Sequence, residues 1–251
     1  GVTLSQGGNT TVPATQNAAT YSGATNGILA SAATGTGGFN TSNYAITYAP
    51  GVLTVNPALL TVSLTAAYSG STTVVPTAST VTGLKNGDSI TSVTSAVVSS
   101  PNVNDGNFVV SVLPGAGSVI NLANYVLAPA RGTNNQADIT QIASVGFTGA
   151  VSSDWFNPAN WNGPMPTLGN VSSVTVPANT VVTFSGSNAA LIPTTAIVNN
   201  GSLTVTGSTN LALSASISGT GNLSYTGTGV LSLSGNNTYT GGTSIGTSIS
   251  N

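Results

Sequence analysis

The chain has 251 residues, of which 39% are hydrophobic and only 2% are charged, and its formal net charge is -2 at pH 7. This length predicts two or three small domains, each with a modest core. So few lysines and arginines cannot form the basic surface that nucleic acids or anionic membranes attract, so we expect neither as a partner. Cysteine and histidine are absent, which excludes disulfides and the common zinc sites.

The hydropathy pattern predicts no helical membrane span. No stretch approaches the ~18 uninterrupted apolar residues that such a helix needs. The best candidate, residues 109–130, is broken by Pro114, Gly115 and Gly117. The sequence begins at Gly1 without a secretory signal, which favours a mature or excised piece of a longer precursor.

Short strands dominate the predicted secondary structure. Glutamate is missing and no window shows sustained helical spacing of apolar residues, whereas alternating runs rich in β-branched and aromatic residues recur. Asn86-Gly87 and Asn200-Gly201 predict tight turns, because both residue types tolerate a positive φ. The predicted strands include residues 44–48, 52–55, 60–64, 108–113 and 171–176.

The first section, residues 1–56, ends in the run NYAITYAPGVLTVNPA (43–58). This run predicts a strand, a Pro-Gly turn and a second strand that stops at a proline. It resembles the end of an MBG-type repeat of large bacterial surface proteins, and TYSG (20–23) is similar to the preceding strand of that repeat. The N-terminal half of such a repeat is not visible.

The second section, residues 57–140, resembles a YDG domain, a module of filamentous haemagglutinin-like adhesins. The matching runs are LTVSLTAAYSGSTT (60–73), GLKNGDSI (83–90), NVNDGNFVVSV (102–112), ANYVLAPA (123–130) and ADIT (137–140). Ser69 departs from the family, which has aspartate between the equivalents of Tyr68 and Gly70. The resemblance implies that both sections are small β-sandwich-like modules.

The third section combines a tryptophan-containing junction or cap, residues 141–196, with repeat-like residues 197–251. The run DWFNPANWNGPMPTLGNVSSVTVPANTVVTF (154–184) is similar to segments that precede β-solenoids in such adhesins. GSLTV at 201, GNLSY at 221 and GVLSL at 229 share a pattern at irregular spacing. GTGVLSLSGNNTYTGGTSI (227–245) resembles the autotransporter-associated β-strand repeat, which implies the start of a parallel β-helix. The final GTSISN replaces the next coil, so we expect an uncapped end.

Few side chains could carry chemistry. Asp88 and Asp105 could form a carboxylate pair, but both stand in Gly-containing turns, and the turn interpretation is favoured. Lys85 is the only candidate base for a nucleophilic serine, and its turn predicts a solvated, protonated amine. We therefore expect no enzyme, catalytic residue or cofactor. The oxygen-bearing side chains of Asn102, Asn104, Asp105 and Asn107 could form a calcium site. A structural turn is the favoured interpretation of these residues.

Trp155, Phe156 and Trp161 concentrate both tryptophans of the chain within seven residues. An exposed platform of these rings could stack on sugars. The alternative, which is favoured, is that they plug the end of the solenoid or seal a joint, since aromatic side chains dominate core and interface energetics.

These observations favour a non-enzymatic, structural or adhesive segment of a secreted bacterial surface protein or extracellular fibre. Copies could polymerise head to tail by β-strand complementation, since the first module lacks early strands and the last coil lacks a successor. An alternative that is favoured at least equally is that the sequence is a portion of a longer chain. The alternative is a carbohydrate-binding module at Trp155 and Trp161. Expected partners are copies of the chain, adjacent modules or surface glycans. The resemblance implies a location outside a Gram-negative cell.

Overall fold

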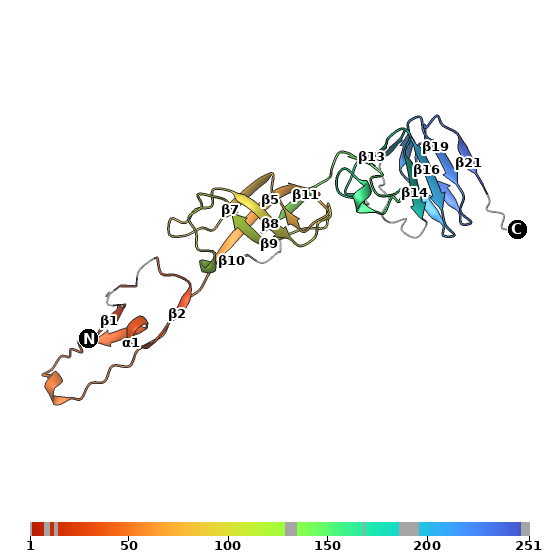
Figure 1. Cartoon of the computed structure of the whole chain (residues 1–251). Coiled ribbons are helices and arrows are strands. Elements are labelled where there is room, and N and C mark those ends of the chain that lie inside the picture. Colours follow the sequence, from red (N-terminus) through yellow and green to blue (C-terminus); the bar gives the residue numbers. More distant parts are fainter. Residues whose placement is uncertain are drawn as a thin grey trace. The chain divides into compact units, whose positions relative to one another are not determined.

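The chain is all-β in a computed structural model, with 43% strand, 6% helix and several sheets, none of them closed (Figure 1). The structure describes residues 2–7, 11–12, 15–128, 135–167, 169–185 and 196–246. The chain divides into two compact units, each of which is treated separately. The expected division into sections 1–56, 57–140, 141–196 and 197–251 stays a prediction.

The first unit comprises Gly1–Val62, Thr80–Ser92 and Pro114–Asn135. Its elements are β1 (Thr3–Gln6), β2 (Ala19–Tyr21), α1 (Gly23–Asn26), β3 (Ile28–Ser31), η1 (Thr41–Asn43), β4 (Leu53–Val55), η2 (Leu122–Asn124), β10 (Tyr125–Leu127) and parts of β5 (Ala58–Ala67) and β7 (Ala78–Thr82). β1 pairs with β3 and β2 pairs with β4, both antiparallel. β10 runs parallel to the first half of β5.

The N-terminal part of this unit has no apolar core of its own. Among the described residues between 2 and 56, only Gln6 and Gly27 are buried. Large apolar side chains are left in contact with water, such as Leu4 at 57% exposed and Val52 at 64%. Two isolated two-stranded ladders are marginally stable in water unless further strands or another surface cover their apolar side.

The expected strand and Pro-Gly hairpin around residues 44–55 are partly wrong. β4 confirms the second strand, but residues 45–50 belong to no ladder. Gly51 exchanges two backbone hydrogen bonds with Ile28, at 2.7 and 3.1 Å. The segment after the turn therefore pairs with earlier parts of the chain, and residues 44–48 are left without that partner.

The two expected tight turns have different outcomes. Asn86 and Gly87 have φ of 58° and 80°, as the prediction requires. Neither Asn200 nor Gly201 has a positive φ, so the tight-turn geometry predicted there is wrong. The two residues still mark a corner, as their turn propensity predicts: it joins two strands of different parallel sheets, and the Gly201 N–H donates to Asn199 Oδ1 at 3.1 Å.

The second unit comprises Ser63–Ser79, Val93–Leu113 and Gln136–Asn251. Its first part holds β6 (Thr73–Val74), β8 (Val93–Val98), β9 (Val109–Pro114) and β11 (Ala137–Thr140). β6, β8 and β9 are neighbours in one sheet, and β11 runs parallel to the second half of β5. Alternate residues of β5 are buried, including Leu64 and Ala66, because successive side chains of a strand point to opposite faces.

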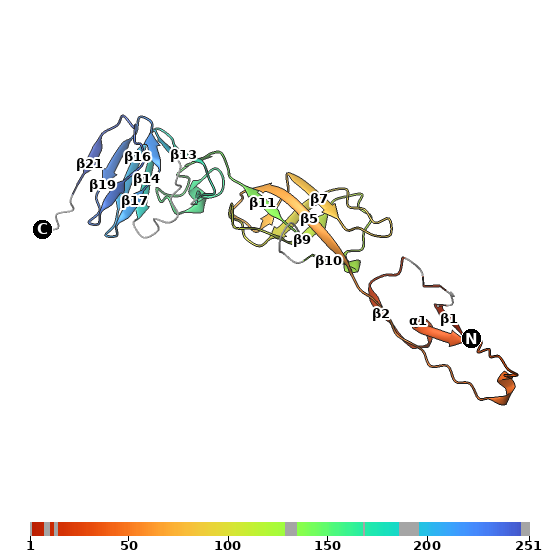
Figure 2. The ribbon, with the colours of Figure 1, turned by 180° about the vertical axis from the view of Figure 1, so that it is seen from behind.

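The second part consists of parallel ladders. Its elements are β12 (Val145–Gly146), η3 (Pro158–Asn160), β13 (Ser173–Val176), β14 (Val181–Ser185), β15 (Ala196–Asn199), β16 (Ser202–Thr206), β17 (Leu211–Leu213), β18 (Ser216–Ser218), β19 (Asn222–Tyr225), β20 (Leu231–Leu233) and β21 (Thr243–Ile245). They form the orders β12-β13-β15-β18, β14-β16-β19-β21 and β17-β20. Figures 1 and 2 show β14, β16, β19 and β21 side by side.

A constant register relates the C-terminal strands. Leu203 lies opposite Leu223, and Leu223 lies opposite Thr243. Leu211 lies opposite Leu231, at the same offset of twenty residues. The irregular spacing of the GSLTV, GNLSY and GVLSL runs is thereby explained, because GVLSL belongs to a different ladder from the other two.

The inward positions of these ladders form the core of the second part. Leu203 and Leu223 are at most 1% exposed, and Leu213 is fully buried. Burial ends at the last rung: Leu231 and Leu233 are only half-buried, and Ile245 is 76% exposed. Residues 247–251 of the final GTSISN lie outside the described residues, so the expected uncapped end stays a prediction.

Candidate functional site

The tryptophan-containing segment forms an aromatic cluster. Trp161 lies edge to face against Phe147, with ring centroids 5.1 Å apart, and against Trp155 at 4.7 Å. Trp155 also packs on Phe184 of β14 at 4.5 Å. Edge-to-face pairs at these separations are favourable because the ring quadrupoles attract one another. The cluster therefore anchors the junction segment on the parallel ladders.

The exposed stacking platform, the less favoured of the two interpretations, fits neither tryptophan. Trp155 is fully buried and Trp161 is only 6% exposed. Phe156 is half-buried and is not one of the stacked pairs around them. The indoles lie in the core because their large apolar area gains more from packing on Phe147 and Phe184 than from contact with water.

Asn160 organises the loop beneath the cluster and was not singled out by the sequence. Its side chain is fully buried. Oδ1 accepts the backbone N–H groups of Val151 and Ser152, at 3.0 and 2.9 Å. Nδ2 donates to Ser152 Oγ and to the Asp154 carbonyl, at 2.9 and 2.8 Å. The amide thus uses both donors and both acceptor positions, as a buried polar group requires.

The two indole N–H groups differ, which leads to a testable difference. Trp161 Nε1 donates to the Trp155 carbonyl at 3.0 Å, whereas the buried Trp155 Nε1 has no partner. We expect Trp161→Phe to lower the free energy of unfolding by about 1 kcal/mol more than Trp155→Phe, because only the former breaks a buried hydrogen bond. Urea unfolding followed by the fluorescence of the remaining tryptophan measures both. A greater loss in Trp155→Phe contradicts the assignment.

A turn with the pattern Asn-x-x-Asn-aromatic recurs three times, and this repetition is the signal that sequence reasoning missed. It occurs at residues 40–44, 121–125 and 157–161. In each copy the first asparagine accepts the backbone N–H two residues later, at 3.0–3.1 Å, and a single 3₁₀ turn follows. The aromatic residue then begins extended backbone. The asparagine caps the turn because its side chain satisfies an N–H that has no partner in the turn itself.

The second asparagine and the aromatic residue are used differently in the three copies. Asn160 organises the junction loop. Asn124 accepts the Ala18 N–H at 2.9 Å and donates to Asn17 Oδ1 at 2.9 Å, all within the first unit. Asn43 and Tyr44 are exposed, and Tyr44 is stacked only on Phe39. The first copy is thus the one whose aromatic residue faces water.

Asp88 and Lys85 lie in the turn that the sequence predicted. The Tyr125 hydroxyl donates to Asp88 Oδ2 at 2.7 Å and accepts the Lys85 N–H at 2.9 Å. Partial burial is the main reason that the pKa of Tyr125 lies above its usual value, with Asp88 as a further cause. Lys85 is exposed. The contacts are those of a stapled turn and place no second carboxylate beside Asp88.

Asp105 also lies in a turn, between Asn104 and Gly106, which both have positive φ. Its carboxylate accepts hydrogen bonds from Ser100 Oγ at 2.6 Å and Asn102 Nδ2 at 3.2 Å. These bonds hold the pKa of Asp105 below its usual value. The carboxylate is therefore engaged with its own turn, as the structural interpretation predicts.

The other residues of the candidate calcium site do not complete a coordination sphere. Asn107 Nδ2 donates to the Asn102 carbonyl at 2.6 Å, and Asn107 Oδ1 is buried without a partner. No group of three or more acidic, histidine or cysteine side chains converges within the described residues. One engaged carboxylate supplies too little charge for tight calcium binding.

No family model matches the sequence, and no curated protein or solved structure is significantly similar to it. The MBG, YDG and autotransporter-associated resemblances are therefore carried by the sequence motifs alone. Among the described residues, no helix is long and apolar enough to span a membrane.

Proposed function

We propose that the chain is a structural and adhesive segment of a secreted bacterial surface protein or extracellular fibre. Two small β-sandwich-like modules of the MBG and YDG kinds lead into the start of a parallel β-helix. The proposed location is the outside of a Gram-negative cell. The resemblance supplies the family and the location, and the inert chemistry of the surface is compatible with both.

The twenty-residue register is the observation that carries this proposal. Parallel strands that recur at a fixed offset, with Leu203 stacked on Leu223 and Leu211 on Leu231, are what successive coils of a β-helix produce. No charged residue follows Asp154 in the sequence. The coils are therefore held by backbone ladders and apolar stacking, which suits a scaffold that spans distance.

Such a scaffold is expected to be insensitive to pH between about 4 and 9. The lowered pKa of Asp105 adds stability that is present above its usual value of 3.8 and is lost as the pH falls through the folded-state pKa. The raised pKa of Tyr125 adds stability that is present below its usual value of 10.0 and is lost as the pH rises through the folded-state pKa. Thermal unfolding, followed by circular dichroism across this pH range at low and high salt, measures how the unfolding midpoint depends on pH. A midpoint that changes steeply inside the range contradicts the proposal.

Head-to-tail polymerisation by strand complementation is a part of the proposal that one feature supports. The residues of β21, the outermost strand of its ladder, are all exposed. An unpaired edge is a template for another strand. Electron microscopy of the purified chain tests this part: regular fibres are expected, and a sample of discrete particles at high concentration overturns it.

Display on bacteria tests the adhesive role. The chain is fused to an unrelated outer-membrane anchor, and attachment and clumping are compared with cells that display a folded domain of similar size. We expect increased attachment, and equal attachment contradicts the adhesive role. The burial of both tryptophans disfavours the carbohydrate-binding alternative, because Trp155 and Trp161 would have to leave the core before a sugar ring could stack on them.

A further inference from the structure

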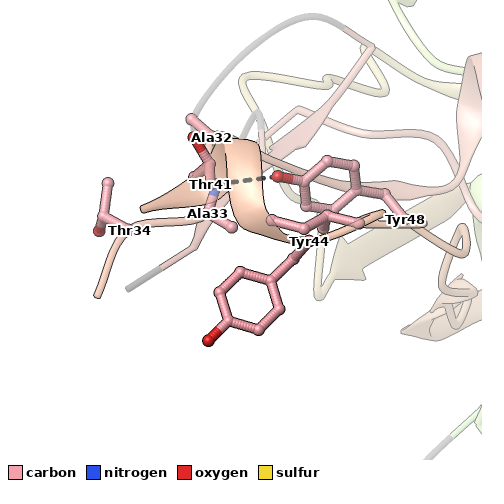
Figure 3. Close-up of a pocket in the computed structure, with 7 residues that line it drawn as sticks. Ala32, Ala33, Thr34, Thr41, Tyr44 and Tyr48 are labelled. Atoms are coloured by element: carbon pink, nitrogen blue, oxygen red, sulfur yellow. Dashed lines mark hydrogen bonds between the residues drawn. The ribbon is translucent and has the colours of Figure 1, made fainter. Parts of the chain in front are cut away.

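Residues 44–48 form an extended segment that no other described strand pairs with. Its side chains Tyr44, Ile46 and Tyr48 line a hollow of about 510 Å³, together with residues 32–34 and Thr41 (Figure 3). The Tyr48 hydroxyl accepts the Ala33 N–H at 2.9 Å. The ring of Tyr44 points away from this hydrogen bond, toward solvent (Figure 3). This side-chain contact bridges the arms of the loop, where a ladder would use backbone bonds.

The other two copies of the Asn-x-x-Asn-aromatic turn show what this segment lacks. Tyr125 opens β10, which pairs with β5. Trp161 forms an antiparallel bridge with Phe147. Tyr44 follows the same capped turn but enters no ladder. In two of the three copies, the aromatic residue after the turn forms a β-bridge or begins a paired strand. The segment after the third copy is extended in the same way but has no partner strand among the described residues.

Residues 44–48 contain neither a charged residue nor a proline, and the nearest proline is Pro50. The first charged residue of the chain is Lys85, so no charge stands on or near residues 44–48 in sequence. Tyr44, Ile46 and Tyr48 are 60%, 37% and 39% exposed. Natural edge strands are blunted by lysines, prolines or bulges, and an apolar edge without them recruits another strand.

The pattern of the segment identifies the strand that fits it. In Tyr-Ala-Ile-Thr-Tyr the large side chains are placed symmetrically about Ile46. An antiparallel pairing centred on Ile46 would set Tyr44 opposite Tyr48 of a second copy and Ile46 opposite its own equivalent. Alternate residues share a face, so all six large side chains would gather on one side.

We propose that residues 44–48 pair antiparallel with the same residues of a second copy, about a twofold axis at Ile46. The interface is isologous, so it closes as a dimer and does not propagate. The inference goes beyond the proposed function, which does not require it: head-to-tail assembly would join copies through their terminal strands, whereas this pairing would join two copies through residues 44–48.

The contact area predicts a weak dimer. At roughly 150–250 Å² for each fully buried aromatic side chain, the exposed parts of Phe39, Tyr44, Ile46 and Tyr48 amount to about 400 Å² per copy. Two copies together stay below the ~1,200 Å² of a standard interface. We therefore expect a concentration-dependent equilibrium, visible by sedimentation velocity at high protein concentration.

Cysteine crosslinking tests the register, since the chain has no cysteine of its own. Only a twofold axis at residue 46 brings that residue within disulfide distance of itself. In the matched control Thr47→Cys, residue 47 faces Ala45 of the other copy and its equivalent lies ~7–8 Å away. We expect Ile46→Cys to form disulfide dimers under oxidised glutathione at least about tenfold faster than Thr47→Cys. Equal rates overturn the proposal.

A charge at the axis supplies the second test. Ile46→Lys places two like charges directly opposite each other, so we expect the dimer dissociation constant to rise at least about tenfold. Val151→Lys, at a residue of the second unit that is 66% exposed, is the control and should leave it unchanged. A wild-type monomer at all concentrations contradicts the pairing. An Ile46→Lys dissociation constant equal to that of the wild type also overturns it.

Discussion

Replacing Gly221 with alanine is expected to lower the free energy of unfolding of the parallel ladders by about 3 kcal/mol, at the upper end of overpacking costs. A Cβ at this position would lie 2.2 Å from the Gly201 carbonyl oxygen and 2.7 Å from the Asn199 side chain. The nearest of these atoms belongs to the backbone of the neighbouring coil, which cannot move aside as the end of a flexible side chain can. The coils would have to separate locally, with loss of ladder hydrogen bonds.

Gly242→Ala is the matched control, because an added Cβ there meets nothing within 4 Å. We expect it to change stability by no more than about 0.5 kcal/mol. Urea unfolding followed by tryptophan fluorescence measures both variants, since Trp155 packs on Phe184 in the first rung of the ladders. Equal stability of the two variants would show that the coils do not approach each other as closely as the register implies.

Replacing Trp155 with alanine should lower the free energy of unfolding by about 3–5 kcal/mol. The side chain is fully buried and contacts both Trp161 and Phe184, so its removal leaves a cavity between the junction and β14. The lost contacts also free the loop that Asn160 holds. We expect the parallel ladders to unfold at lower temperature, while the first unit is unaffected.

Phe156→Ala separates this effect from the general loss of an aromatic residue. Phe156 is adjacent but only half-buried, so we expect less than half the cost of Trp155→Ala. Thermal unfolding monitored by near-ultraviolet circular dichroism compares them. If Trp155→Ala is tolerated as well as Phe156→Ala, the indole is not the anchor that its burial indicates.

Strand positions were largely predictable because alternation is a local property. Residues 60–64 fall within β5, residues 108–113 overlap β9, and residues 171–176 overlap β13. The pairing of those strands was not predictable, because β5 finds partners in β10 and β11, more than sixty residues away. Residues 44–48 show the limit: their alternation is as clear as that of β5, yet no strand of the described residues pairs with them.

The candidate site followed the same division. The sequence identified Trp155 and Trp161 as an aromatic concentration. It left two interpretations open: an exposed platform for sugars and a buried plug. Burial decided between them, since the rings pack on Phe147 and Phe184. Asn160 was missed because a lone asparagine carries no local signal, although the threefold recurrence of its turn pattern could have revealed it.

By itself, the sequence determined a chain of short strands with very few charges, because composition and alternation act through the solvation and geometry of single residues. Only the tertiary structure decided that Asn200-Gly201 is a corner between parallel sheets, that GVLSL lies in a different ladder from GNLSY, and that both indoles are inside. The physical reason is that these features depend on which segments, distant in the sequence, pack against each other in the folded chain. A carbonyl from the preceding coil, not a turn preference, requires glycine at residue 221.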